Sequence, residues 1–253
     1  MSKPVIVTAD KIRKRKKIIK IVKIVFLCIL SFLTILFIIL SFIYNGGKFV
    51  ITLDPNSSLE SSLALFEDSE YKDVKRKLYA EEINFMDNIS IKWLPENIDD
   101  EKDGSHNGQN YIAYTFYIEN KGKDIVNYWY EVIIDDVIKN VDNAVRIMIF
   151  RNGEKTVYAK INEVTNMPED GTKPFASKES ALLEQRKDFK PKDIDKFTIV
   201  VWLEGDDPDC VNAIIGGEIK MHMNIIEEHI EQDENMKKDE NLKVEEGEDE
   251  QKD

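Results

Sequence analysis

The sequence predicts a mainly β protein, with an N-terminal transmembrane helix followed by an extracytoplasmic, immunoglobulin-like antiparallel β-sandwich that carries one or two short helices. Three observations support this prediction. An uncharged run lies near the N-terminus at residues 24–44, apolar and polar residues alternate from residue 83 onward, and turn residues separate the alternating segments. Many short strands separated by turns are typical of a sandwich.

The run from Ile24 to Tyr44 has the length of a membrane-spanning helix. About 20 apolar residues cross the roughly 30 Å hydrocarbon core of a bilayer. Inside lipid the backbone must satisfy its own hydrogen bonds, which favours a helix. A buried helix of a soluble protein seldom reaches this length without a polar stripe. The sequence therefore predicts the lipid bilayer as a partner.

The charges beside this run predict its orientation. Residues 1–23 carry nine lysines and arginines, including the tract Arg13–Lys17, against Asp10 alone, a net charge of +8. The whole chain has a net charge of −13 and residues 24–44 carry none, which leaves −21 for residues 45–253. Because positive flanks stay in the cytoplasm, we expect the N-terminus inside and the rest of the chain outside the cell membrane.

A cleaved signal peptide is the alternative interpretation. Its apolar region normally has about 7 to 15 residues and is followed by small residues at the cleavage site. Here the run is longer and ends in the bulky residues Phe42, Ile43 and Tyr44. The sequence favours an uncleaved anchor, with processing near Asn45–Gly47 as the alternative.

Residues 45–82 form a membrane-proximal segment of mixed character. It opens with a strand-like pattern, and Leu63 and Phe66 then recur at helical spacing. Ser57 and Glu60 offer a capping box for a helix N-terminus. We therefore predict a strand and one or two short helices before the sandwich begins at residue 83.

Residues 83–226 carry the strand pattern of the sandwich. Asn152-Gly153 predicts a type I′ hairpin, because these residues adopt positive φ angles readily. The segment 197–205 is apolar on both faces and predicts a central strand, whereas 181–189 fits either a strand or a helical turn. The alternating segments include 89–93, 112–118, 128–134, 144–150, 155–161 and 216–225. Their expected inward residues include Ile112, Tyr114, Phe116, Ile118, Tyr128, Tyr130, Val132, Ile134, Ile219, Met221, Met223 and Ile225.

Residues 227–253 are strongly acidic and nearly free of large apolar side chains, which predicts a disordered external tail. Cys28 lies in the predicted membrane helix and Cys210 in the external part, so the two cannot pair. The external domain must then be held together by its own core. The predicted regions are 1–23, 24–44, 45–82, 83–226 and 227–253.

The acidic turn "WLEGDDPDC", residues 202–210, holds the candidate metal ligands Asp206, Asp207 and Asp209. Calcium is a hard ion that takes oxygen ligands from acidic loops, and it is the cofactor that these residues could hold. The turn lacks the ligand spacing, central glycine and closing glutamate of an EF-hand. The favoured interpretation is a solvated turn at 207–209, in which proline sets the backbone.

No catalytic residue is predicted. Cys210 needs a base to act as a nucleophile, and His106, His222 and His229 form no recognisable pair with it. Its neighbouring carboxylates disfavour a thiolate, so a partly buried structural thiol is expected. Strand alternation turns His222 away from Met221 and Met223, which excludes a copper site. The sequence contains no HExxH, GxSxG or Walker motif.

The acidic external part is a poor match for nucleic acid, whose phosphates need a surface of lysine and arginine. An aromatic run at 128–130 offers a contact patch for carbohydrate or protein. Alternation places Trp129 opposite its two neighbours, so burial in the sandwich is the favoured interpretation and recognition the alternative.

Residues 83–225 resemble the envelope proteins of Gram-positive bacteria that have one N-terminal hydrophobic segment and an external β-sandwich. They are distantly similar to the TasA/camelysin-type exported proteins, which include biofilm fibre subunits. The matching features are Trp202–Gly205, the acidic turn and Gly216-Gly217. The resemblance implies a sandwich and an external location. It carries over no zinc site, because no zinc motif is present.

These observations predict a non-enzymatic, single-pass cell-envelope protein with a structural, adhesive or partner-binding function. The expected partners are a cell-wall component, another envelope protein or further copies of the chain. A secreted fibre subunit released by signal peptidase is the first alternative. A metal-assisted hydrolase that uses the acidic turn is the least favoured one.

Overall fold

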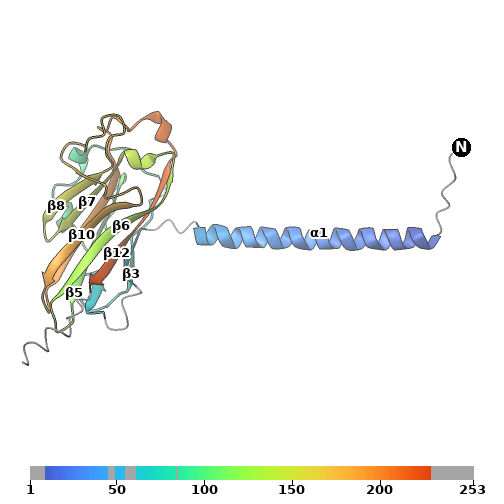
Figure 1. Cartoon of the computed structure of the whole chain (residues 1–253), viewed down its shortest axis with the longest axis horizontal. Helices are drawn as coiled ribbons and strands as arrows, with labels where there is room; N and C mark the ends of the chain where they lie inside the picture. The colour runs from blue at the N-terminus through green and yellow to red at the C-terminus, as the bar shows by residue number, and fades with distance from the viewer. Residues whose placement is uncertain (1–8, 45–48, 55–60, 84, 229–253) are drawn as a thin grey trace, which may run out of the picture. The chain divides into compact units, whose positions relative to one another are not determined.

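The computed structural model describes residues 9–44, 49–54, 61–83 and 85–228, which fall into two compact units, Met1–Gly47 and Lys48–Asp253. The first unit contains helix α1 (Ala9–Tyr44), and the second contains a β-sandwich (Figure 1). The sandwich unit therefore begins near residue 48. Its first three strands lie in residues 45–82, the segment for which the sequence predicts a membrane-proximal region.

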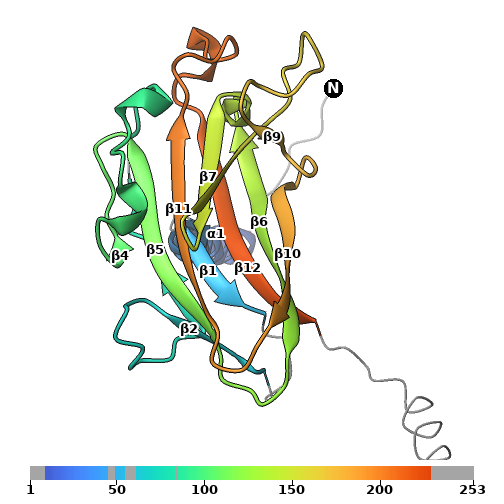
Figure 2. The ribbon, with the colours of Figure 1, turned by 90° about the vertical axis from the view of Figure 1, so that its left-hand side faces the viewer.

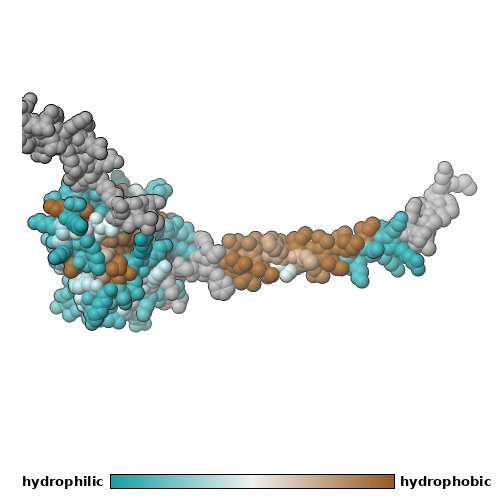
Figure 3. Space-filling view, turned by 90° about the horizontal axis from the view of Figure 1, so that it is seen from below, coloured by the Kyte–Doolittle hydropathy of each residue, from teal (hydrophilic) through white to brown (hydrophobic). Residues whose placement is uncertain are grey.

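Helix α1 presents its apolar side chains to the outside. Its segment Arg13–Leu40 is long and apolar enough to cross a membrane, and every side chain in it is exposed. Figure 3 shows the apolar surface along most of this helix, with a hydrophilic stretch toward its basic end. The helix begins well before Ile24 because lysine and arginine are good helix formers. A membrane anchor and a signal sequence both fit this helix.

The sandwich consists of two sheets, which Figure 2 shows as two layers. The five-stranded sheet has the order β10-β6-β12-β1-β3, with strands β1 (Val50–Leu53), β3 (Lys77–Tyr79), β6 (Val126–Ile138), β10 (Ser180–Phe189) and β12 (Glu218–Glu228). The seven-stranded sheet has the order β2-β5-β11-β7-β8-β9, and β4 pairs with β5. Its strands are β2 (Leu63–Phe66), β4 (Gly104–Ser105), β5 (Tyr111–Asn120), β7 (Val145–Arg151), β8 (Glu154–Ala159), β9 (Lys173–Pro174) and β11 (Ile194–Leu203).

Most strand pairs are antiparallel, as predicted, and two pairs are parallel. Strand β1 runs parallel to β12 and antiparallel to β3, and β8 runs parallel to β9. The first strand of the domain thus lies beside the last one. Such a long-range pairing depends on the whole chain path, which a local pattern of residues does not reveal.

The main core fills the space between the sheets. Tyr114, Phe116 and Ile118 of β5 meet Tyr128 and Tyr130 of β6 in one buried cluster. The predicted inward residues of β12 join it, with Met221, Met223 and Ile225 buried and Ile219 partly buried against them. Burying one large apolar side chain contributes about 1.5 to 3 kcal/mol, so these alternating strands supply much of the stability.

Strand β11 is buried on both faces, as its sequence predicts. Phe197, Ile199 and Val201 face the main core, while Val200 and Trp202 face a second cluster on the other side of the sheet. Its neighbours are β5 and β7. The predicted hairpin is also present, since Asn152 and Gly153 between β7 and β8 have φ angles of 52° and 83°.

One prediction in the membrane-proximal segment is wrong. Residues 63–66 form strand β2 rather than part of a helix, because all four are buried and pair with β5. Ser57 and Glu60 lie outside the described residues. The undecided segment 181–189 belongs to strand β10.

The predicted strand 89–93 is replaced by an isolated bridge at Ile89 and a short 3₁₀ helix, η1 (Ile91–Trp93). A second 3₁₀ helix, η2 (Ile98–Asp100), follows, and together they cover the outer face of β11. The backbone N–H groups of Ile91 and Lys92 donate hydrogen bonds to Glu204 Oε2 and Ser90 Oγ, in competition with a strand ladder. Two more 3₁₀ turns are η3 (Val141–Asn143) and η4 (Asn212–Ile214).

The sequence predicts an acidic tail that starts at residue 227. Glu227 and Glu228 instead belong to β12, and Glu227 accepts hydrogen bonds from Ser61 and Ser62. These contacts extend the last strand beyond its apolar residues. The rest of the predicted tail, 229–253, lies outside the described residues.

Candidate functional site

The acidic turn follows strand β11 directly, and its first carboxylate is an organising group. Glu204 is buried, and its Oε2 accepts hydrogen bonds from Trp202 Nε1 and the Ile91 backbone N–H, both at 3.0 Å. Its Oε1 accepts from the Asp206 N–H at 3.2 Å. Glu204 therefore pins η1 onto the end of β11, and this role accounts for its burial.

Asp207 is buried rather than solvated, which corrects the prediction of a solvated turn at this residue. Its Oδ2 lies against the Arg146 guanidinium of β7, and the exposed fractions of the two side chains are 0% and 5%. Its Oδ1 accepts a hydrogen bond from the Asp209 N–H at 2.7 Å. The arginine lies far away in the sequence, so the turn alone gave no sign of this ion pair.

Asp206 turns away from its two predicted partners. Its Oδ2 accepts a hydrogen bond from Ser90 Oγ at 2.8 Å and lies 3.9 Å from Lys92 Nζ. Asp207 and Asp209 instead meet Glu169, which comes from the connection between β8 and β9. One ligand oxygen from each of these three carboxylates lies within 4.8 Å of the other two. We call Glu169, Asp207 and Asp209 the carboxylate triad.

Cys210 is partly buried, and its Sγ accepts a hydrogen bond from Asn88 Nδ2 at 3.3 Å. It packs beside a small apolar cluster that includes Val141 and Ile214. These contacts fit the expected structural thiol. The two histidines that the structure describes have other partners, and His229 lies outside the described residues.

His106 is buried, although the sequence places it in a polar loop. Its Nδ1 lies 3.0 Å from the Gly104 carbonyl oxygen, and its Nε2 lies 3.0 Å from that of Ile98. The ring thus ties the start of β4 to η2. His222 lies on β12 with its Nδ1 2.8 Å from an Asp135 carboxylate oxygen, while Met221 and Met223 pack into the core as predicted.

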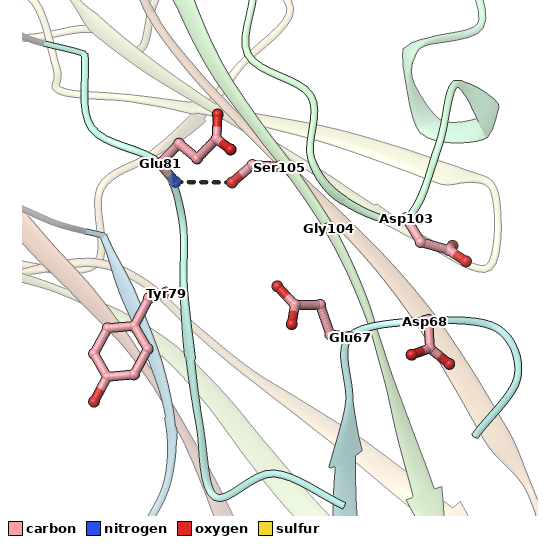
Figure 4. A pocket seen from close by; sticks show the side chains of 7 residues that line it. All are labelled: Glu67, Asp68, Tyr79, Glu81, Asp103, Gly104 and Ser105. Atoms are coloured by element: carbon pink, nitrogen blue, oxygen red, sulfur yellow. Dashed lines mark hydrogen bonds between the residues drawn. The ribbon is translucent and has the colours of Figure 1, made fainter. Parts of the chain in front are cut away.

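A second acidic site is a shallow pocket of about 310 Å³ between the ends of β2, β3 and β4. Figure 4 shows Glu67, Asp68, Glu81 and Asp103 around it, with Tyr79, Gly104 and Ser105 completing the lining. No local pattern in the sequence points to this group, because its four carboxylates come from separate segments. Its lining contains acidic, hydroxyl and aromatic side chains, a combination that suits a small cationic group.

Tyrosine hydroxyls hold two of these pocket carboxylates. Tyr114 donates to Glu67 Oε1 at 2.7 Å, and Tyr117 donates to Asp103 Oδ1 at 2.6 Å. Burial pushes the pKa of Asp103 upward, but hydrogen bonds from Tyr117 and Ser69 outweigh this effect, so the pKa lies below its usual range. Burial and the hydrogen bond to Glu67 raise the pKa of Tyr114, which keeps its hydroxyl a donor.

The turn, η1 and the β8–β9 connection meet at one end of the sandwich, the upper end in Figure 2. The contacts of Ser90 with Asp206 and of Asn88 with Cys210 hold the first two of these segments together, and the triad places Glu169 of the β8–β9 connection beside the turn. We call this region the loop end. The loop end also includes the segment around η4, which follows the turn. Its exposed apolar side chains, with their exposed fractions, are Trp93 (73%), Ile161 (39%), Val164 (88%), Met167 (65%), Val211 (51%) and Ile215 (67%).

Comparisons with known proteins add little to this geometry. No protein-family model matches the chain, and no curated protein matches it. A solved structure, the β-glucosidase from Kluyveromyces marxianus in complex with glucose, aligns with 76% of this chain at 14% identity and a TM-score of 0.24. The aligned part spans 19% of that enzyme.

Proposed function

We propose that the chain is a non-enzymatic, single-pass membrane protein that displays its β-sandwich on the outer side of a bacterial cell envelope for contact with a partner. One observation carries this proposal: every side chain of Arg13–Leu40 in α1 is exposed, and most are apolar. In water that surface would cost about 25 cal/mol per Å² of apolar area. A bilayer removes this cost.

The charge distribution supports the proposed orientation. The basic residues cluster before the apolar segment, with Arg13–Lys17 in the first turns of α1, and the sandwich is acidic. Positive flanks are retained in the cytoplasm. The sandwich then lies outside, where an acidic surface keeps it soluble.

The loop end supports partner contact. Six large apolar side chains are exposed there, and buried polar contacts hold η1 and the acidic turn in place beside them. Exposed apolar residues that gather on one region mark interaction surfaces more often than isolated ones do. The partner classes are a cell-wall component, an envelope protein or a second copy of the chain.

The non-enzymatic part rests on the contacts of the potential nucleophile and bases. Cys210 Sγ contacts Asn88, while His106 faces two backbone carbonyls and His222 faces Asp135. A nucleophile needs a base within hydrogen-bond reach. These contacts support a structural role for all three side chains.

A secreted fibre subunit is a second candidate, because α1 lies near the N-terminus and a signal sequence has the same features. The two candidates differ in the mass of the mature chain. An anchor keeps α1, whereas a released subunit begins near Asn45–Gly47. Intact-mass analysis of the protein from cells therefore separates them.

The proposal is tested with a tag after Asp253 in intact cells. We expect the protein in the membrane fraction after alkaline extraction, at full mass, with the tag open to external protease. Replacing Ile29 and Leu33 by lysine should release it from the membrane, since each charge costs about 2.5 to 3.5 kcal/mol at the helix centre. Ile29→Leu with Leu33→Ile is the matched control. A tag reachable only after permeabilisation would contradict the proposal.

A further inference from the structure

The carboxylate triad joins two connections of the seven-stranded sheet. Glu169 belongs to the β8–β9 connection, while Asp207 and Asp209 belong to the turn after β11. Their ligand oxygens lie within 4.8 Å of one another. Carboxylates this close repel each other unless a proton or a cation lies between them.

A second observation concerns Glu169 itself. Its Oε1 is buried, with less than 1 Å² of accessible surface, and has no hydrogen-bond partner among the described residues. It is the sole buried side-chain oxygen or nitrogen in that condition in the described part of the chain. Buried polar atoms nearly always have a partner, because desolvation without a hydrogen bond is costly. Glu169 as a whole is partly exposed, so this oxygen has no partner in the described part of the chain but can take one from water or from a cation.

The charges near the triad do not balance. Arg146 offsets one of the three carboxylates through Asp207. Lys160, the lysine at the start of the β8–β9 connection, is held by Asp142 at 2.8 Å, by Asn143 at 2.6 Å and by Glu163 at 3.4 Å. Two negative charges remain at the triad, which matches the charge of one divalent cation.

The arrangement also prepares Asp207 as a ligand. Arg146 and the Asp209 N–H fix its two oxygens, and each carboxylate oxygen has a further lone pair for a metal. A ligand whose position is already set loses little freedom when the ion binds. Arg146 lowers the attraction for a cation at the same time, so the affinity is modest.

We propose that Glu169, Asp207 and Asp209 bind a Ca²⁺ ion that ties the β8–β9 connection to the acidic turn. An all-oxygen ligand set favours a hard cation over zinc or copper. Calcium accepts irregular geometry, whereas Mg²⁺ demands a near-ideal octahedron. Water completes the coordination, and we expect a Kd of about 10⁻⁴ to 10⁻³ M, as in extracellular modules. Asp206, a candidate from the sequence, is outside this site.

The test uses the full-length protein in detergent, stripped with EDTA and titrated with CaCl₂ at pH 7.5. Calorimetry should report saturable binding in that range, and the thermal midpoint should rise with calcium. Glu169→Gln and Asp209→Asn should each weaken binding by more than about tenfold, since even outer-shell partners of a metal are worth about 10- to 100-fold. Asp206→Asn, which removes the same charge from the same turn, should bind like the parent.

The order of stabilities provides a second readout. In EDTA, Glu169→Gln should melt no lower than the parent, because it removes a repelling charge; in excess calcium it should melt lower. A merely structural glutamate would lower the midpoint in both buffers. Absence of calcium binding by the parent up to about ten times the upper Kd expected for such modules would overturn the proposal. Unchanged binding by both triad variants, or lower midpoints for Glu169→Gln in both buffers, would do the same.

Discussion

The loop end and the pocket both gather carboxylates, but different groups neutralise them. At the loop end a buried guanidinium faces Asp207. In the pocket, hydroxyl groups of Tyr114 and Tyr117 hold Glu67 and Asp103. An ion pair in a dry site is costly to break, whereas a partly solvated carboxylate can exchange a hydroxyl for water. Acidic residues that look alike in the sequence therefore differ in the partners that the fold gives them.

The largest effect is expected from breaking the buried pair. Arg146→Met leaves the Asp207 carboxylate buried without its counter-charge, and should lower the free energy of unfolding by about 3 to 5 kcal/mol. Urea unfolding followed by tryptophan fluorescence measures it. The control is Lys72→Met at the exposed Lys72–Glu70 pair, which should cost at most about 1 kcal/mol. Equal losses of unfolding free energy in Arg146→Met and Lys72→Met would show that the buried ion pair stabilises the fold no more than an exposed one.

A smaller effect is expected where a hydroxyl holds the carboxylate. Tyr114→Phe removes the donor to Glu67 and should lower the free energy of unfolding by about 1.5 to 3 kcal/mol, the range for hydrogen bonds to charged groups. Tyr79→Phe at the rim of the same pocket is the control, since that ring is 55% exposed. It should stay within about 0.5 kcal/mol of the parent. If Tyr114→Phe lowered the free energy of unfolding as much as Arg146→Met, the hydroxyl and the guanidinium would stabilise their carboxylates equally, contrary to expectation.

Acid titration tests the hydrogen bonds that hold Asp103 in the pocket. The pKa of Asp103 is lower in the folded chain than in the unfolded one, so its stabilising contribution is full above the unfolded pKa of about 3.9 and is lost as the pH falls through the folded value. Asp103→Asn should flatten this part of the stability profile. We expect less than about 1 kcal/mol, because water screens this partly exposed group. Equilibrium unfolding between pH 2 and pH 7 checks it, and an unchanged acid slope would count against the hydrogen bonds to Asp103.

The smallest effect is expected on the exposed side of the loop end. Lys92 lies 3.9 Å from Asp206, and both side chains are largely exposed. Lys92→Ala should change the free energy of unfolding by no more than about 0.5 kcal/mol. The same urea experiment measures it. A loss above about 2 kcal/mol would show that the exposed Lys92–Asp206 pair contributes as much as a buried ion pair, which would contradict the comparison with Arg146 and Asp207.

The elements that the sequence predicted well are those whose pattern is local. Strands β5, β6 and β12 show a period of two, β11 is a continuous apolar run, and Asn152-Gly153 marks a hairpin. The apolar run of α1 needs only its own length and composition. The helix predicted at residues 63–66 is wrong because a long-range contact decides the structure there. Pairing with β5 overrides the helical spacing.

The candidate site was predicted in part. Asp207 and Asp209 are in the triad, but Glu169 comes from another connection, and no pattern in residues 202–210 points to it. The pocket carboxylates lie on separate segments for the same reason. Spacing along the chain identifies groups on one element, while groups on different elements meet only after the sheets have formed.

By itself, the sequence determined the apolar helix, the charge difference between its two sides and the strands of the sandwich, since these depend on neighbouring residues and on solvent. Only the tertiary structure decided that β1 lies beside β12, that Arg146 faces Asp207 and that Glu169 joins the acidic turn. The physical reason is that burial and pairing across distant segments depend on the path of the whole chain. One aspartate is thereby placed in water and its neighbour in a dry ion pair.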